Sequence, residues 1–264
     1  MKKYLAITTP IALLLVFFIY LPIGAILTEA FSGKSGFSGE QFGKVFADKK
    51  LMKTVQNSFV VAASSAAIAT IFGTMLGYGL DRYRFPGKRL FNGVLHVPVF
   101  VPDIVLGVAM LLTLEILYFR VGLERGMASL ILAHVTIQIP MVAIIVRARL
   151  EGWAASYEEA AADLGASPTN RFRTITIPMI RPGIIAGGLL AFTISLGDFV
   201  LSYFTAGTAS RTVPLEVYRL IKDGRGDEVN ALASILILTS LFCAVAVAML
   251  QRSRKLETVE YGDV

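Results

Sequence analysis

The chain has little charge and few of the side chains that build chemical sites. Only 17% of its 264 residues are charged, whereas a soluble domain carries about 25%. It has two histidines and one cysteine, so it shows no metal-ligand spacing and cannot form an internal disulfide bond. It also lacks the G-x-x-x-x-G-K-[ST] loop that cradles nucleotide phosphates. These absences argue against a soluble enzyme and against nucleotide binding by this chain.

What the chain has instead is apolar residues in long runs. Hydrophobic residues make up 55% of the sequence, and the mean hydropathy is +0.67. A helix needs about 20 mostly apolar residues to cross a bilayer, and only helices or closed barrels satisfy their backbone in lipid. The runs therefore predict an all-α polytopic membrane protein with one transmembrane domain over residues 1–264. The six predicted spans are 10–28, 57–80, 93–118, 127–146, 183–206 and 229–250.

The basic residues indicate how the spans are oriented. An even number of spans puts both termini on one side, and the dense basic clusters at 81–89 and 252–255 would then lie at inner span ends. We therefore expect both termini in the cytoplasm. Because the positive charge flanks the spans and forms no single patch, the net charge of +6 does not indicate nucleic-acid binding. The first run follows Lys2 and Lys3 as a signal peptide would, but its length and the five later runs favour a retained helix.

A polar block interrupts the apolar runs at residues 151–181. Ser156 with Glu159 three positions later fits a capping box that starts a short helix. Gly165 suits the left-handed turn that ends such a helix. Ser167, followed by proline, fits the cap of a second short helix. The block is therefore predicted to form two short helices joined by a glycine turn.

The composition of this block suits contact with another protein. The alanines at 160–162 keep the first helix thin, so that a partner can approach its backbone, and Glu158 and Glu159 supply charge for a basic partner. Pro178 and Pro182 are expected to stop the helical backbone before the fifth span. A solvated amphipathic loop, or one that lies on the membrane surface, would explain the same residues.

The block closely resembles the EAA loop of permease subunits in binding-protein-dependent ABC importers. That pattern is Glu-Ala-Ala, three residues, Gly, nine residues, Ile-x-Leu-Pro, and Ile177 departs from it mildly where the family prefers Leu. The resemblance implies a type I ABC importer (MetI-like) permease fold, in which this cytoplasmic loop is a coupling helix docked on an ATP-hydrolysing subunit. The coupling residues that it implies are Glu158, Glu159, Ala160, Ala161 and Gly165.

Other segments resemble PotC-type spermidine/putrescine permease subunits, namely 82–88, 102–105, 214–218 and 227–233. Permeases for iron, sulfate or thiamine share some of them and stay open as alternatives. The resemblance implies a bacterial inner-membrane subunit that forms half of a polyamine pathway. Its implied partners are a second permease subunit (PotB-like), an ATPase dimer (PotA-like) and an external polyamine-binding protein (PotD-like). ATP and Mg would be bound by the ATPase, so the chain itself is expected to be non-catalytic and to bind no cofactor or metal.

Charged residues inside spans are costly and usually functional. The predicted spans hold Asp103, Glu115 and Asp198 but no central Lys or Arg, which favours a cationic solute. At 1.5 Å per residue, Asp103 lies about 15 Å along the third span, near mid-membrane. It follows Pro98 and Pro102, which are expected to break the helix beside protein or a water-filled cavity. Asp103 therefore faces the pathway, caps the helix after the break, or does both.

The fifth span carries a periodic set of polar residues. Ser195, Asp198, Ser202 and Thr205 follow one another at i, i+3, i+7 and i+10, which predicts one polar stripe on a single helix face. Small polar residues also hydrogen-bond between membrane helices. Because a carboxylate belongs to the stripe, Ser195, Asp198 and Ser202 are predicted to face the pathway.

The outer segment after the fifth span contains a short amphipathic helix that starts at Pro214. Tyr218 and Lys222 share one face of this helix at i, i+4. We predict that they form part of an outer gate; for Lys222 a role in a solvated cap is the alternative.

Two other classes of function remain for such a chain. A passive channel or receptor anchor would need no docking block and no ATP. An intramembrane enzyme would combine Asp103 with His96 or His134, but Pro98 and Pro102 disrupt the helix that would place His96 and Asp103 on one face.

Overall fold

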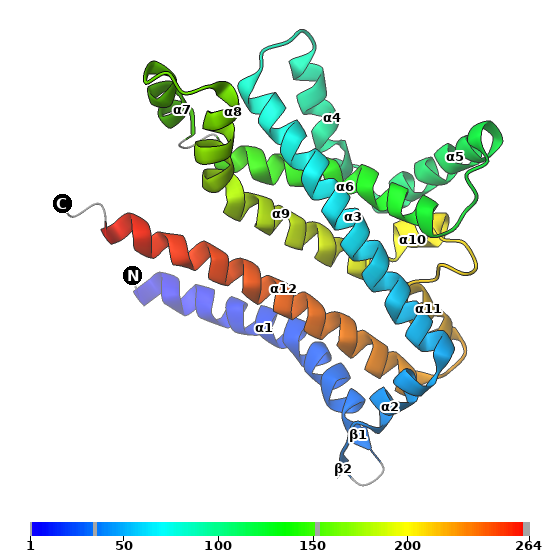
Figure 1. The fold of residues 1–264 in the computed structure, drawn as a ribbon. Helices are drawn as coiled ribbons and strands as arrows, with labels where there is room; N and C mark the ends of the chain where they lie inside the picture. The colour runs from blue at the N-terminus through cyan, green and yellow to red at the C-terminus, as the bar shows by residue number, and fades with distance from the viewer. Residues whose placement is uncertain (1, 34–35, 151–153, 261–264) are drawn as a thin grey trace.

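The computed structural model describes residues 2–33, 36–150 and 154–260 (Figure 1). The first half contains α1 Lys2–Ala30, α2 Glu40–Ala47, α3 Lys49–Arg82, α4 Lys88–Phe100, α5 Asp103–Val121 and α6 Met127–Leu150. The second half contains α7 Ala154–Asp163, α8 Pro168–Arg171, the π-helical turn η1 Phe172–Thr176, α9 Ile177–Gly197, α10 Val200–Thr205, α11 Val213–Lys222 and α12 Gly226–Glu260. A small antiparallel hairpin pairs β1 Ser32–Gly33 with β2 Gly36–Phe37, with Ser32 opposite Phe37.

Within the described residues, six helical stretches are long and apolar enough to cross a membrane. They are Thr8–Ala30, Lys49–Arg82, Asp103–Val121, Met127–Leu150, Pro168–Gly197 and Glu228–Met249. The prediction of six membrane helices is therefore confirmed. The bounds differ from the predicted ones mainly in the third and fifth spans, where the structure places helix breaks.

The third predicted span is two helices. α4 ends at Phe100, Val101 and Pro102 are extended, and α5 begins at Asp103. The break lies at Pro102, because a proline pushes the residue before it out of the helical region. Pro98, which was also expected to break the helix, lies inside α4.

The fifth predicted span begins earlier and ends earlier than the sequence suggested. Helical backbone continues from α8 through η1 into α9, so the expectation that Pro178 and Pro182 stop the helix is wrong. Pro178 is the second residue of α9, two positions after the π-helical turn ends at Thr176, and a proline is tolerated in the first turn of a helix. At the other end α9 stops at Gly197, Asp198 is extended, and α10 starts at Val200.

The centre of the bundle is formed by α3, α6 and α9, which pack along one another. Small residues allow the closest approach: a Cβ built on Gly77 of α3 would lie 2.7 Å from the backbone oxygen of Ala143 in α6. Such small-residue contacts are typical of helix packing in membranes. α12 packs against α9, and α2 and α11 pack against α12.

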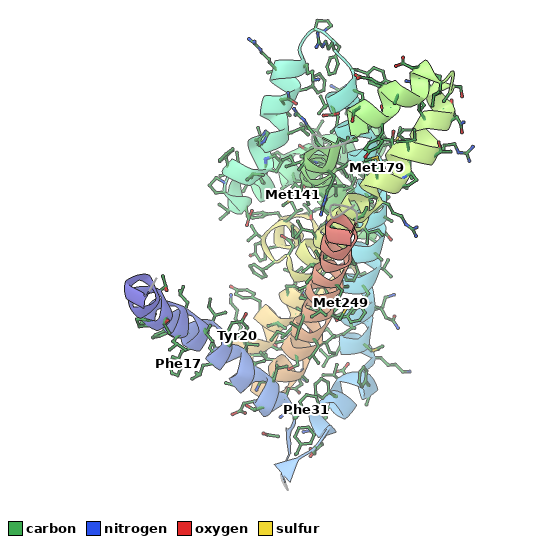
Figure 2. The ribbon with its side chains drawn as sticks, turned by 90° about the vertical axis from the view of Figure 1, so that its left-hand side faces the viewer. Phe17, Tyr20, Phe31, Met141, Met179 and Met249 are labelled. Carbon is green, nitrogen blue, oxygen red and sulfur yellow. The ribbon has the colours of Figure 1, made fainter. Side chains whose placement is uncertain are left out.

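α1 lies largely apart from this bundle. It contacts α12, but Figure 2 shows its first part standing away from the other helices, and its Phe17 and Tyr20 side chains are more than half exposed. The first residues of α1 and the last of α12 lie at the same end of the molecule as α7 and α8, whereas the hairpin, α2 and α11 lie at the opposite end (Figure 1).

Candidate functional sites at the α7 end and in the bundle

α7 is followed by the predicted glycine turn. Gly165 has φ +82°, and its N–H donates to the carbonyl of Ala162 while the N–H of Ala166 donates to that of Ala161. This pair of bonds is the Schellman motif, which needs a left-handed residue that only glycine adopts without strain. The turn directs the chain sharply from α7 into α8.

Of the two helix caps predicted for α7 and α8, the structure has only the one at α8. The Ser167 hydroxyl accepts a hydrogen bond from the N–H of Asn170 at 3.4 Å, as predicted for the second helix. The expected cap at Ser156 is wrong, because α7 already begins at Ala154 and Ser156 lies inside it. The first three residues of the predicted block, 151–153, lie outside the described residues.

The outward face of α7 is exposed at the end of the molecule. Glu159, Ala160 and Gly165 are exposed, and Ala161 is half-buried. Leu164 is 89% exposed although it is large and apolar. The exposed side chains of this face are accessible to another protein.

Glu158 does not share this face. Its carboxylate forms an ion pair with Arg82 at the end of α3 and accepts a hydrogen bond from the Thr176 hydroxyl. Of the two adjacent acids, Glu159 is therefore the one that presents its charge outward. No sequence pattern indicated Arg82 and Thr176 as partners of Glu158, because they come from other helical segments.

A cavity of about 160 Å³ lies between α5, α6 and the break after α9. Its polar lining consists of Asp103 from α5, His134 and Gln138 from α6, and Asp198 from the break. The structure thus brings together the two carboxylates that were predicted to face the pathway. Among the described residues that line this cavity, none is Lys or Arg.

Asp198 caps α10 and also faces the cavity. Its Oδ2 accepts the N–H of Ser202 at 2.8 Å, and its Oδ1 accepts that of Leu201 at 3.4 Å. Side-chain oxygens that accept these amides stabilise a helix start. Asp103, by contrast, is the exposed first residue of α5, and its helix is capped by Pro102 without a side-chain bond.

Ser195 and Ser202 do not form a stripe on one helix, because the helix is broken between them. Both instead share hydrogen bonds with His134, Ser195 at 2.8 Å from Nδ1 and Ser202 at 3.3 Å from Nε2. Ser65 of α3 adds a bond to Ser195 at 3.2 Å. The predicted stripe is wrong as a helix face, yet three of its four members, Ser195, Asp198 and Ser202, meet around the buried His134 ring. Thr205 donates to the Leu201 carbonyl and is buried.

Sequence reasoning missed His134 and Gln138 as parts of this site. The two residues lie at i, i+4 and therefore share one face of α6, which was the available signal. Gln138 Nε2 donates to the carbonyl of Ala191 at 3.1 Å, while Gln138 Oε1 is buried and has no hydrogen-bond partner among the described residues. A buried acceptor without a donor is costly, so Gln138 carries an unsatisfied acceptor beside the cavity.

At the opposite end of the molecule, Tyr218 and Lys222 of α11 contact each other as predicted. The Lys222 ammonium lies 4.6 Å from the centroid of the Tyr218 ring, within the range of a cation–π contact. The hydrogen bond with Tyr218, and then its charge, raise the pKa of Lys222. The Tyr218 ring also lies 5.1 Å from that of Phe199, which belongs to the break before α10.

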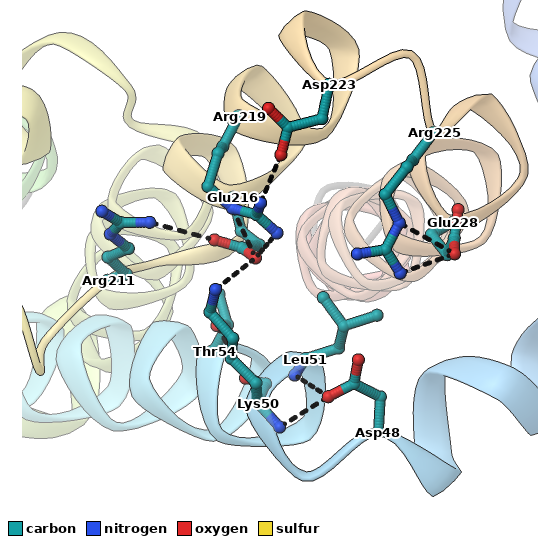
Figure 3. A network of polar contacts seen from close by, with 10 residues as sticks. All are labelled: Asp48, Lys50, Leu51, Thr54, Arg211, Glu216, Arg219, Asp223, Arg225 and Glu228. Atoms are coloured by element: carbon teal, nitrogen blue, oxygen red, sulfur yellow. Dashed lines mark hydrogen bonds and ion pairs between the residues drawn. The ribbon is translucent and has the colours of Figure 1, made fainter.

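α11 is held on the N-terminal end of α3 by a polar network (Figure 3). Glu216 is fully buried and pairs with Arg219, with Arg211 at 3.7 Å and with Lys50 of α3 at 4.0 Å. Burial would raise the pKa of Glu216, but the hydrogen bond and charge of Arg219, with Lys50 and Arg211, lower it. Asn57 of α3 donates to the carbonyls of residues 209 and 211, which fixes the segment that leads into α11.

Comparison with known proteins gives one consistent family. The family described as binding-protein-dependent transport system inner membrane component matches residues 69–255. The spermidine/putrescine transport system permease protein PotC of Haemophilus influenzae is 38% identical over 241 residues, which cover 89% of this chain and 92% of that protein. The putrescine transport system permease protein PotI of Escherichia coli is 37% identical over 229 residues, which cover 83% of this chain and 82% of that protein.

Solved structures show the same fold. A subunit of a bacterial ABC transporter involved in the import of the acidic polysaccharide alginate aligns with a TM-score of 0.72 at 16% identity, over 96% of this chain and 95% of that one. A chain of the MetNI methionine ABC transporter in an inward-facing conformation aligns with a TM-score of 0.65 at 18% identity, over 76% of this chain and 94% of that one.

Proposed function

The chain belongs to the family of binding-protein-dependent transport system inner membrane components, and we propose that it is the permease subunit of an ATP-driven importer of polyamines. It is a multi-pass inner-membrane protein with the permease fold of type I ABC importers. The single observation that supports a cationic cargo is the cavity lined by Asp103 and Asp198 without Lys or Arg among its described lining residues.

The chemistry of the cavity suits an ammonium group. Two carboxylates and the Oε1 atom of Gln138 are acceptors, and an ammonium offers three donors and a positive charge. A volume of about 160 Å³ corresponds to roughly five waters at about 30 Å³ each. The cavity would therefore receive one aminoalkyl arm of a polyamine at a time.

The same chemistry separates polyamines from the other cargoes. Sulfate would meet two carboxylates and no cation in this cavity, and like charges repel strongly where water is excluded. For a bare metal ion, the described residues contain no group of three His, Cys, Asp or Glu side chains placed so that they could hold it. Thiamine is cationic but carries a bulky ring system, which fits a narrow cavity less well than an alkyl arm does.

Energy would come from partner subunits that bind ATP and Mg. An ATPase subunit would dock on α7 through Glu159, Ala160 and Ala161, with Gly165 fixing the turn that shapes this surface. The end of the molecule that carries α7, the start of α1 and the end of α12 would then face the cytoplasm (Figure 1). ATP binding would draw two such docking helices together and switch access by rocking the spans.

The other partners follow from the arrangement of the chain. A second permease subunit would supply the other half of the pathway, because Asp103 is exposed at the start of α5. A binding protein would deliver cargo at the opposite end, where α11 lies. Tyr218 and Lys222 would form part of the outer gate, since Tyr218 contacts Phe199 and motion of α11 would reach the break beside Asp198.

The test is polyamine uptake by the assembled transporter in membrane vesicles. Asp103→Asn and Asp198→Asn should each lower uptake while the complex still assembles. Glu115→Gln is the matched control, because Glu115 is an acid of the same helix α5 but lies half-exposed beside Arg125. Unchanged uptake kinetics in both aspartate variants would overturn the proposal that the pathway carries a cationic solute. Solute flux without ATP would indicate a passive channel instead.

A further inference from the structure

A shielded ion pair ties α7 to the inner end of α3. Arg82, the last residue of α3, donates from Nη2 to Glu158 Oε1 at 3.3 Å, and its Nε lies 3.2 Å from Glu158 Oε2. The two side chains are only 17% and 15% exposed. Asp81 accepts a further bond from Arg82 Nη1 at 2.9 Å, which orients the guanidinium. The guanidinium thus makes one hydrogen bond and a second close charge contact to the same Glu158 carboxylate.

Glu158 also holds the segment that follows α7. The buried Thr176, in the π-helical turn η1, donates its hydroxyl to Glu158 Oε1. Arg171 donates from Nη1 to the backbone carbonyl of Glu158 at 3.3 Å. A π-helical turn is uncommon and is frequently found at functional sites; here it places Thr176 against the carboxylate. One side chain therefore joins three elements, α7, η1 and α3.

An aromatic contact runs beside the ion pair. Tyr78 lies one turn before Arg82 on α3, so both residues share a face. The Tyr78 ring packs edge-on against Phe172 of η1, with centroids 4.8 Å apart and planes at 63°. The last two turns of α3 thus carry a charged and an aromatic contact to the same segment.

We propose that Glu158 and Arg82 are a positioning pair that transmits displacement of α7 to α3 during transport. This inference rests on the proposed function, because it assumes that an ATPase subunit moves α7. Along the chain, α7 connects to α6 on one side and to α8, η1 and α9 on the other, and its main contacts among the described residues are with α8 and η1. The pair adds a second connection, to a helix that is remote in the sequence.

The second connection matters because of where α3 packs. Gly73 and Gly77 bring α3 into backbone contact with α6, and α3 also packs along α9. Without the pair, α7 would act on α3 only through the packing of α3 against α6 and α9. With Glu158 bound to Arg82, the inner ends of α3 and α9 move together, and the tightly packed bundle shifts as one body.

The pair can be tested in the assembled transporter by measuring polyamine uptake and ATP hydrolysis side by side. Glu158→Gln and Arg82→Gln remove one charge each and keep most of the side-chain volume. Both are expected to lower uptake per ATP hydrolysed by about fivefold or more, while the complex assembles at wild-type yield. Arg82→Lys keeps the charge and should retain more uptake per ATP than Arg82→Gln. Asp163→Asn, an exposed acid at the end of α7, is the matched control and should behave as wild type.

A merely structural role would lower the yield of the complex and leave uptake per ATP unchanged in what assembles; that result would overturn the inference. If Glu158→Gln does not assemble, Thr176→Val decides, because it removes only the hydroxyl that donates to the Glu158 carboxylate. Lower uptake per ATP hydrolysed in this variant supports the inference, and wild-type uptake per ATP overturns it. Failure of the proposed function is a distinct result, since the wild-type complex would then show no ATP-driven polyamine uptake at all.

Discussion

The Nε2 atom of His134 lies 3.7 Å from Oδ2 of Asp198, at the break between α9 and α10. A ring from α6 therefore faces the carboxylate that caps α10 and also lines the cavity. Because His134 hydrogen-bonds with serines on both sides of the break, it holds the two pieces of the fifth span in one arrangement.

Replacing His134 with alanine should destabilise the protein. The substitution removes a buried ring and leaves the hydroxyls of Ser195 and Ser202 without that partner, which together cost about 3 kcal/mol. The thermal unfolding midpoint of the purified complex should fall. His96→Ala is the control, because His96 is exposed and bonds only to the carbonyl of Asn92 within its own helix. Equal midpoints in the two variants would show that His134 does not hold the break.

Gln138 should set the affinity of the pathway for cargo. In Gln138→Leu the acceptor Oε1 is lost, and a hydrogen bond to a charged group is worth about 1.5 kcal/mol or more, roughly a tenfold change. We expect KM for polyamine uptake to rise by about that factor while ATP hydrolysis continues. Uptake measured over a range of cargo concentrations checks this. An unchanged KM would mean that the cargo does not contact this oxygen.

Glu216 should make the stability of the packing of α11 on α3 depend on pH in the acid range. Its pKa is lowered in the folded protein from the ordinary value of 4.5, so its stabilising contribution is fully present above pH 4.5 and is lost as the pH falls through the lowered pKa. At neutral pH, Glu216→Gln should cost about 3 kcal/mol, because Arg219 loses its buried partner.

Thermal unfolding between neutral and acid pH checks both parts of this prediction. The midpoint of the wild type should fall more steeply in acid than that of Glu216→Gln. Glu124→Gln, at an exposed acid, should follow the wild type. Parallel pH curves for wild type and Glu216→Gln would contradict the assigned role.

Gly77 should tolerate no side chain. A Cβ there would lie 2.7 Å from the backbone oxygen of Ala143, and a backbone atom cannot move aside cheaply, so Gly77→Ala should cost about 1–3 kcal/mol. Gly79→Ala, two residues on in the same helix, meets nothing within 4 Å and should be neutral or slightly stabilising. The two unfolding midpoints compare them directly, and equal values would contradict the close packing of α3 on α6.

The exposed face of α7 should lose its binding of the ATPase subunit when its charge or its glycine turn is changed. Glu159→Lys reverses an exposed charge, and Gly165→Pro cannot adopt the left-handed turn at φ +82°. Both variants should reach the membrane in normal amounts, retain less ATPase subunit on purification and lose most ATP-driven uptake. Intact uptake in both, with normal expression, would refute docking at this face.

Much of the polar block at residues 151–181 could be predicted, because its turn and caps depend on local sequence. The φ of Gly165 and the cap at Ser167 depend on a few neighbouring residues, and both are as expected. The prolines were misjudged because Pro178 lies in the first turn of α9, where a proline is tolerated, and the sequence pattern did not indicate that helix start. The direction of Glu158 was missed for a different reason, since its partner Arg82 comes from α3.

The sequence by itself determined the six spans and the polar block between the fourth and fifth. Lipid offers the backbone no hydrogen bonds, so the length of an apolar run already decides that it crosses the membrane as a helix. Only the tertiary structure decided which side chains meet. His134 and Ser202 are 68 residues apart, and their contact depends on the rotation of α6 and on the break at Asp198. Apolar patterning cannot encode that rotation, because the lipid-facing and protein-facing sides of a membrane helix are both apolar.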